Sequence, residues 1–267
     1  MWFGWSSEQE RFSATFELTS IDGIHLDAAV HHTPVDPARG VVLLVHGITV
    51  DMDEGGGMFV RLADRLVASG FNVVRFSFRG HGASGGTPEG MTIAGECLDL
   101  QAAMAAVDER FPGQQLSIVA ASFGAVSVAL SLSWLDGLHR LVLWNPVLDL
   151  SLTFLTPELA WGRENFGPDQ QKVLQDSGFL LVDAPVSYDI ASEFARSRPD
   201  TALHTVVGSD HRFDSRERED EAIEVTVEWL SEGSSVMSKQ REANRTKNRG
   251  LRREQQDQEV CSPRVRG

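Results

Sequence analysis

One serine lies where the chain changes abruptly from one pattern to another. Ser122 follows a short apolar run, Leu116–Val119, typical of a buried strand, and precedes small apolar residues, 125–132, typical of a packed helix. Only about one tight turn separates the two, and small residues such as Gly124 permit so sharp a corner. The pattern G-x-S-x-G, here with Ala120 in place of its first glycine, lifts a serine hydroxyl out of a sheet edge. Such a hydroxyl can act as a nucleophile.

A serine hydroxyl needs a base, usually a histidine that a buried carboxylate orients, before it attacks a carbonyl at neutral pH. His211 is the strongest candidate because it directly follows the last predicted strand and precedes the last predicted helix. The other histidines lie at hairpin edges, in turns or beside strands, and the pair His31-His32 has no third ligand that would suggest a metal site. We therefore predict His211 as the general base and no metal.

Two aspartates compete for the role of the acid that orients this base. Asp183 follows an apolar run, and between it and His211 there is room for one helix and one strand, as the order Ser…Asp…His requires. Asp149, after the preceding strand, is the alternative. Asp210 adjoins the base in sequence, where a carboxylate is expected to cap a turn. We predict Asp183, with Asp149 left open.

The tetrahedral intermediate of acyl transfer needs two N–H donors aimed at its oxyanion. Phe123 directly follows the serine, at the positive end of a predicted helix. Ile48 lies in the loop after the run Val41–Val45, and Gly47 permits the backbone to come close. We predict the amides of Ile48 and Phe123 as the oxyanion hole, and His46 and Gly47 as lining the substrate site.

The elements that would position these residues alternate between strands and helices. Such alternation predicts a mostly parallel sheet with helices on both faces, whose ligands bind beyond the carboxyl ends of the strands. The predicted strands are Phe12–Leu18, Ile24–Val30, Val41–Val45, Asn72–Phe78, Leu116–Val119, Leu141–Trp144, Gly178–Val182 and Ala202–Val207. The predicted helices are Phe59–Ser69, Thr92–Arg110, Ala125–Leu132, Tyr188–Arg198 and Asp220–Glu232. The loops that carry His46, Arg79–Ser84 and Ser122 would all lie at one sheet edge.

Charge divides the chain into two parts. The formal net charge is −14, yet the residues from Gly233 onward hold nine Lys/Arg against four Asp/Glu. We predict one α/β domain over 1–232, with a short cap or loop region at about 146–178, and a disordered basic tail at 233–267. An acidic body repels phosphate backbones, so we expect no nucleic-acid partner for the domain.

Targeting and redox signals are few. Cys97 and Cys261 offer neither a disulfide framework nor metal-ligand spacing. The N-terminal residues lack the basic region and long apolar core of a signal peptide. The most apolar window, Leu116–Leu132, is too short and too rich in serine to span a bilayer, so we expect a cytoplasmic protein without stable membrane insertion.

Four motifs together resemble the α/β-hydrolase superfamily, in particular its bacterial esterase, lipase-like and serine-aminopeptidase-like branch. They are Leu44-Val-His-Gly47, Phe78-Arg-Gly-His-Gly-Ala-Ser84, Ala120–Gly124 and Gly208-Ser-Asp-His-Arg-Phe213. The resemblance implies a Ser122 nucleophile, a His211 base and an acid after the strand before the last. Met91-Thr-Ile-Ala-Gly-Glu96 is similar to cinnamoyl and feruloyl esterases, and the elbow is similar to the acyl-carrier-protein thioesterase of bacterial bioluminescence.

The chain departs from this superfamily before Asp183, where the cap and the expected strand are shortened. Either Phe179–Val182 substitutes for that strand, or the sheet has a gap beside the base. The resemblance implies hydrolysis of a small carboxylic ester or thioester through an acyl-enzyme, without a cofactor. Two alternatives stay open, an acyltransferase or thioesterase on acyl carriers and a catalytically impaired, hydrolase-like binding protein.

Overall fold

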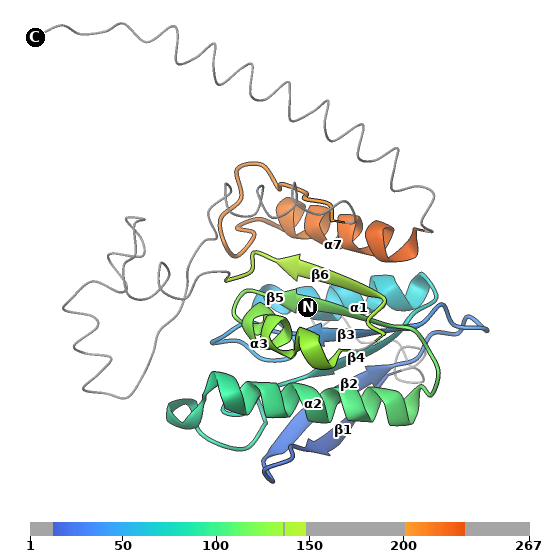
Figure 1. Cartoon of the computed structure of the whole chain (residues 1–267). Helices are drawn as coiled ribbons and strands as arrows, with labels where there is room; N and C mark the ends of the chain where they lie inside the picture. The colour runs from blue at the N-terminus through green and yellow to red at the C-terminus, as the bar shows by residue number, and fades with distance from the viewer. Residues whose placement is uncertain (1–12, 136, 148–200, 233–267) are drawn as a thin grey trace, which may run out of the picture.

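The computed structural model describes residues 13–135, 137–147 and 201–232 (Figure 1). Several predictions fall outside the described residues: the strand Gly178–Val182, the helix Tyr188–Arg198, nearly all of the cap, and the tail. Both candidate acids, Asp149 and Asp183, lie there too.

A six-stranded sheet in the order β1-β2-β4-β3-β5-β6 forms the centre of the described part. The last four of these strands in space run parallel to one another, whereas the β1–β2 hairpin pairs antiparallel, both within itself and with β4. The strands are β1 (Ser13–Thr19), β2 (His25–His31), β3 (Val41–Val45), β4 (Asn72–Phe76), β5 (Leu116–Ala121) and β6 (Arg140–Trp144). The prediction of a mostly parallel sheet is confirmed.

Helices cover both faces of this sheet (Figure 1). The helices are α1 (Met58–Ala68), α2 (Ile93–Arg110), α3 (Gly124–Ser131) and α7 (Arg216–Ser231), with short 3₁₀ turns η2 (Gly55–Gly57), η3 (Pro88–Gly90) and η4 (Leu132–Trp134). In β3, Val42 and Leu44 pack with α1 and α7, whereas Leu43 and Val45 pack with α2 and α3. A strand buried on both faces needs no polar residue, which explains why Val41–Val45 is apolar throughout.

Local capping fixes where the helices begin. Thr92 caps α2, because its hydroxyl oxygen accepts the Gly95 N–H at 3.0 Å. Helix α7 begins earlier than the predicted Asp220, because Ser215 accepts the Arg218 N–H at 3.4 Å and acidic residues fill the first turn. The sequence analysis missed this cap because the charged first turn carries no apolar periodicity.

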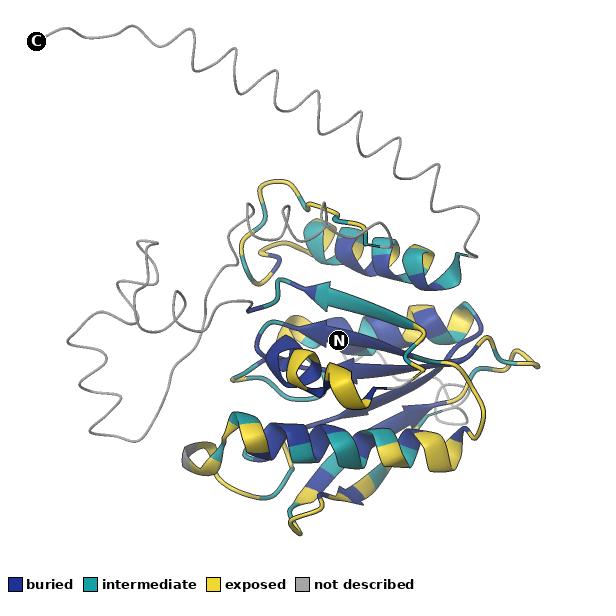
Figure 2. Ribbon diagram, viewed as in Figure 1, coloured by how far each residue is buried: buried dark blue, intermediate teal, exposed yellow. Residues whose placement is uncertain are grey.

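The predicted strand Ala202–Val207 is wrong, since the structure assigns no strand to these residues. A strand requires a hydrogen-bonded neighbour, and within the described residues the sheet ends at β6, which Figure 2 shows only half-buried. Instead, Val206 packs in the apolar cluster of α1 and α7, and the His204 ring lies 2.7 Å from a Glu221 carboxylate oxygen on α7. The segment thus follows the helix rather than the sheet.

Candidate active site

The turn between β5 and α3 holds Ser122 in a strained conformation. Its φ is +49°, a left-handed value that residues with a side chain seldom adopt. The end of β6 and the residues just after it support this turn, because the Ser122 N–H donates to the Trp144 carbonyl at 2.8 Å and the Val147 N–H donates to the Ser122 carbonyl at 3.1 Å. Gly124 is required, since a Cβ there would lie 2.2 Å from the His46 carbonyl oxygen.

His211 lies directly against this serine. The distance from Ser122 Oγ to His211 Nε2 is 2.9 Å, and both residues are half-buried. At this distance the imidazole can take the hydroxyl proton as the serine attacks. The structure therefore brings together two of the predicted residues that are far apart in the sequence.

The loop that carries His211 is held by contacts of its own. Asn145, just after β6, donates from Nδ2 to the His211 carbonyl at 2.8 Å, and Phe213 packs on the Trp144 ring at a centroid distance of 5.9 Å. Asp210 Oδ1 accepts two N–H groups, from Arg212 at 2.9 Å and Asp214 at 3.0 Å. Asp210 thus forms a turn, as expected. Sequence analysis missed Asn145; its position directly after a parallel strand was the available signal.

The opposite wall of the site is the turn after β3. Gly47 lies so close to the nucleophile that a Cβ there would be 3.0 Å from Ser122 Cβ. The side chain of Ile48 packs with Phe123, Val126 and Val147 in one small cluster. The backbones of both predicted oxyanion donors, Ile48 and Phe123, thus belong to residues that pack together beside the serine.

His46 supports this turn from inside the protein. Its ring is fully buried; Nε2 accepts the Phe78 N–H at 2.9 Å, so the proton is on Nδ1, which donates to the Gly47 carbonyl at 2.6 Å. Burial, with a smaller effect of His81, lowers the pKa of His46 to about 3, which keeps the ring neutral. With both nitrogens engaged and no exposed surface, His46 lies behind the site and does not line it as we expected.

The loop between β4 and α2 packs against the same turn. Arg79 donates to Asp99 and to Asp22, and these hydrogen bonds raise the pKa of its guanidinium. His81 lies 5.0 Å from the His46 ring, and its Nε2 is 3.4 Å from the Thr49 nitrogen. The predicted loop Arg79–Ser84 therefore packs against the turn after β3 through the His81 ring.

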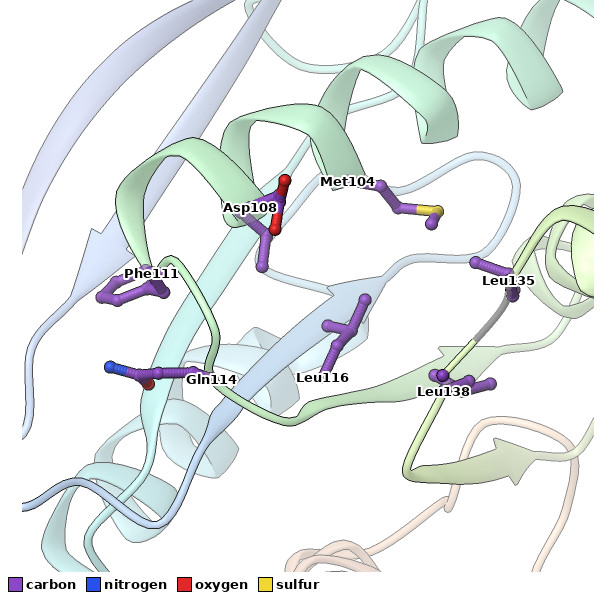
Figure 3. A pocket seen from close by; sticks show the side chains of 9 residues that line it. Met104, Asp108, Phe111, Gln114, Leu116, Leu135 and Leu138 are labelled. Carbon is purple, nitrogen blue, oxygen red and sulfur yellow. The ribbon is translucent and has the colours of Figure 1, made fainter.

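Two hollows differ in their relation to this chemistry. A cavity of about 570 Å³ adjoins the turn after β3 and is lined in part by Ile48, Asp51, Glu54, His81 and Met91. A smaller cavity, of about 240 Å³, lies between the end of α2 and the start of β5 (Figure 3). It is therefore at the amino ends of the parallel strands, whereas Ser122 follows the carboxyl end of β5. Of these two cavities, the first adjoins the turn that carries Gly47 and Ile48 beside Ser122.

Comparison with known families shows to which family the chain belongs. The family model described as "Serine aminopeptidase, S33" matches residues 36–225, a span that includes Ser122 and His211. The chain belongs to this family. As an S33 family member it is an α/β serine hydrolase, so the superfamily predicted from the four motifs is confirmed. Membership in a hydrolase family also implies a small-molecule substrate.

Solved structures agree with this S33 assignment at the level of the fold. An esterase of Pyrococcus furiosus is 20% identical, with 85% of this chain and 93% of that chain covered and a TM-score of 0.61. A Butyrivibrio proteoclasticus protein with bound ferulic acid is 20% identical, with 80% of this chain and 96% of that chain covered and a TM-score of 0.59. A lidless α/β serine hydrolase of Xanthomonas campestris is 19% identical, with 82% of this chain and 93% of that chain covered and a TM-score of 0.56. The comparison with curated proteins finds no match.

Two further observations on the described residues of this S33 member concern membrane spans and metal ligands. None of the helices in the described ranges is long and apolar enough to cross a membrane. Among those same residues, no group of three or more His, Cys, Asp or Glu side chains is arranged to hold a metal ion.

Proposed function

We propose that this S33 family member cleaves small carboxylic esters or thioesters through an acyl-enzyme formed on Ser122. One observation carries the proposal: Ser122 Oγ lies 2.9 Å from His211 Nε2, on a turn whose left-handed φ raises the hydroxyl beside Gly47. A serine and a histidine from distant parts of the chain, at this distance and on this turn, form the nucleophile and base of acyl transfer.

In the first half of the reaction Ser122 Oγ attacks the carbonyl carbon while His211 Nε2 takes the hydroxyl proton. The carbonyl oxygen becomes an oxyanion, which the N–H groups of Phe123 and Ile48 bind. The Gly47 N–H already donates to Glu54 Oε2 at 2.8 Å, which favours the next amide, that of Ile48, as the second donor. Helix α3 begins at Gly124 and adds its positive end.

The leaving group then departs as an alcohol or a thiol with the proton that His211 returns to it, which leaves the acyl-enzyme. In the second half water attacks the acyl carbon while His211 takes a proton from it. The bond from that carbon to Ser122 Oγ then breaks as His211 returns the proton to Ser122 Oγ, and the acid product is released. If an alcohol or a carrier thiol replaces water, the same acyl-enzyme gives an acyltransferase. Each proton in these steps moves through His211, so no cofactor enters them.

The acid that orients His211 is proposed to be Asp183, with Asp149 as the alternative. A carboxylate on Nδ1 holds the tautomer that leaves Nε2 free to accept the serine proton. Replacing the true orienter by Asn should lower kcat on the order of 10⁴-fold. Asp183→Asn and Asp149→Asn are therefore compared in the same assay, and two equally mild effects would exclude both aspartates.

A second candidate function follows from the family description, which names an aminopeptidase. Amide and ester cleavage share the acyl-enzyme, and they differ in how strongly the leaving group must be protonated. Esters are favoured here because the similar folds include an esterase and a protein with bound ferulic acid. Comparing kcat/KM for p-nitrophenyl esters with that for amino-acid p-nitroanilides decides between the two.

The decisive test is p-nitrophenyl acetate and butyrate hydrolysis by wild type and Ser122→Ala. We expect the variant to lose at least ~10³-fold in kcat/KM. Ser69→Ala, remote on the end of α1, is the matched control and should keep full activity. Equal rates for wild type and Ser122→Ala, together with no labelling of Ser122 by a fluorophosphonate, would support the catalytically impaired binding protein instead.

A further inference from the structure

The second oxyanion donor depends on how the backbone turns at Gly47. Glycine has no side chain to restrict φ and ψ, so the two peptide groups that flank it can rotate freely unless other groups hold them. A larger residue would crowd the serine, because a Cβ at Gly47 would approach Ser122 Cβ to 3.0 Å. The turn therefore needs partners that hold each peptide group separately.

Glu54 holds the first of these peptide groups. Its Oε2 accepts the Gly47 N–H at 2.8 Å, and its Oε1 accepts the Gly55 N–H at 3.2 Å. Gly47 is buried, so its N–H would otherwise lack the partner that buried amides require. The same bond removes the Gly47 N–H from competition with Ile48 for the oxyanion.

His46 holds the second peptide group. The Gly47 carbonyl and the Ile48 N–H belong to one planar unit, in which they point in opposite directions. Because the buried His46 donates from Nδ1 to the Gly47 carbonyl, the Ile48 N–H points away from the His46 ring. Glu54 and His46 thus fix the two peptide units on either side of Gly47.

We propose that Glu54 is a positioning residue for catalysis: its carboxylate fixes the Gly47 amide so that the Ile48 N–H faces the oxyanion. This inference rests on the proposed acyl-transfer function of Ser122. Glu54 acts in this proposal through its bond to the Gly47 backbone. Because Glu54 also lines the cavity beside Ile48, the test has to separate an effect on kcat from an effect on KM, which direct contact with the substrate would change.

The conformation of Glu54 agrees with a specific role. Its φ of +59° and ψ of 168° fall in a region that is almost restricted to glycine, and such a residue persists only where its surroundings hold it. Burial also raises the pKa of Glu54, because the charged carboxylate is less well solvated there than in water. Glu54 is thus held in a place that is unfavourable for both its backbone and its charge. A glycine at this position would avoid both costs, but it could not bind the Gly47 amide.

The test compares Glu54→Ala, Glu54→Gln and Asp53→Ala with wild type. Loss of the anchor should lower kcat for p-nitrophenyl butyrate roughly 10²-fold in Glu54→Ala, as for removal of one oxyanion donor, with KM changed less than about threefold. Glu54→Gln keeps an oxygen for the Gly47 N–H and should recover most of kcat. Asp53 lies in the same loop but pairs with Arg75, so Asp53→Ala should keep wild-type kcat.

A second measurement reports the anchor without any turnover. Amide hydrogen exchange at Gly47 should be slow in wild type and in Glu54→Gln and should accelerate at least about tenfold in Glu54→Ala. If wild type shows fast exchange at Gly47, or if Glu54→Ala keeps both slow exchange and wild-type kcat, the positioning role is excluded. A wild type with slow exchange at Gly47 but no esterase activity contradicts the proposed function and leaves the anchor of the Gly47 amide established.

Discussion

The two sides of the site are built in different ways. Ser122 lies between β5 and α3, where its N–H donates to Trp144 at the end of β6 and its carbonyl accepts the N–H of Val147 just beyond. His211 lies in a segment to which the structure assigns no strand, between 201 and the start of α7. There the main supports are Asn145, which binds the His211 carbonyl, and the packing of Phe213 on Trp144.

This difference predicts different sensitivities. The β5–α3 turn on the serine side is held by backbone bonds and by buried strands. Around this turn the loss of a supporting apolar side chain should be shared among its neighbours, whereas a change in the backbone should be more severe. The histidine side depends on a few side chains, so the loss of any one of them should reach the base. On the serine side, activity should therefore be most sensitive to a substitution of Gly124. On the histidine side, it should be sensitive to the loss of single side-chain contacts.

Among the residues that support the site without a proposed part in the reaction, the largest effect is expected at Gly124. In Gly124→Ala the new Cβ would meet a backbone oxygen, that of His46, at 2.2 Å, and backbone can yield only by moving the elbow or the oxyanion turn. We expect kcat/KM for p-nitrophenyl butyrate to fall at least ~10²-fold, as for a misplaced nucleophile. Gly90→Ala, where a Cβ meets only Thr87 Oγ1 at 3.6 Å, is the control. A fully active Gly124→Ala would show that the serine side tolerates backbone movement.

A pH-dependent effect on stability is expected behind the elbow. Glu96 on α2 is buried and accepts the Ser127 hydroxyl of α3 at 2.8 Å, and burial raises the pKa of Glu96 to about 7 from 4.5. For an acid with a raised pKa the folded state binds more protons, so its contribution to stability falls as pH rises from 4.5 to 7. Glu96→Gln should therefore gain at most ~3 kcal/mol relative to wild type between pH 4.5 and pH 8.

This prediction is measured as the difference in unfolding free energy between Glu96→Gln and wild type, from urea denaturation at each pH. The difference cancels the titration of other groups, including His46, whose lowered pKa destabilises the fold in acid, below its ordinary pKa. Glu109→Gln, exposed near the end of the same helix, is the control and should show no such trend. A flat difference for Glu96→Gln would mean that Glu96 titrates normally.

On the histidine side, Asn145→Gly should lower kcat roughly tenfold, because the free energy of about one hydrogen bond that positions His211 is lost. Glycine accepts the φ of +41° at this position, so the change removes the donor to the His211 carbonyl without adding strain. Asn72→Ala is the control, because it loses its bonds to Gln114 and Thr33 far from the site. It should lower stability and leave kcat unchanged, whereas an unchanged kcat in Asn145→Gly would show that Phe213 alone suffices.

The same contrast explains which features the sequence could predict. The elbow is a local pattern: a strand, a serine between small residues and a helix follow one another within a few positions, so Ser122, Gly124 and the β5–α3 turn can be recognised directly. Strand β3, which is buried on both faces, is likewise a continuous apolar run. The parallel sheet follows from their alternation with helices.

Contacts between distant segments could not be predicted in this way. Asn145 and Glu54 act through single hydrogen bonds to backbone groups, and an Asn after a strand or a Glu in an acidic loop carries no signal of its partner. Ala202–Val207 alternates like a strand, but whether it becomes one depends on a neighbouring strand. For the same reason His46, which has the position of a site residue, proved to be buried behind the turn.

The smallest effect should come from the bond that joins the two sides. Trp144 on β6 donates from Nε1 to Thr226 Oγ1 on α7 at 2.8 Å, and Thr226→Val keeps the shape but removes the acceptor. A buried indole N–H without a partner should lower the unfolding free energy by about 1–2 kcal/mol. The exposed Thr15→Val is the control. We expect kcat to stay unchanged, because Asn145 and Phe213 still hold the loop; a parallel loss of kcat would mean that α7 itself positions His211.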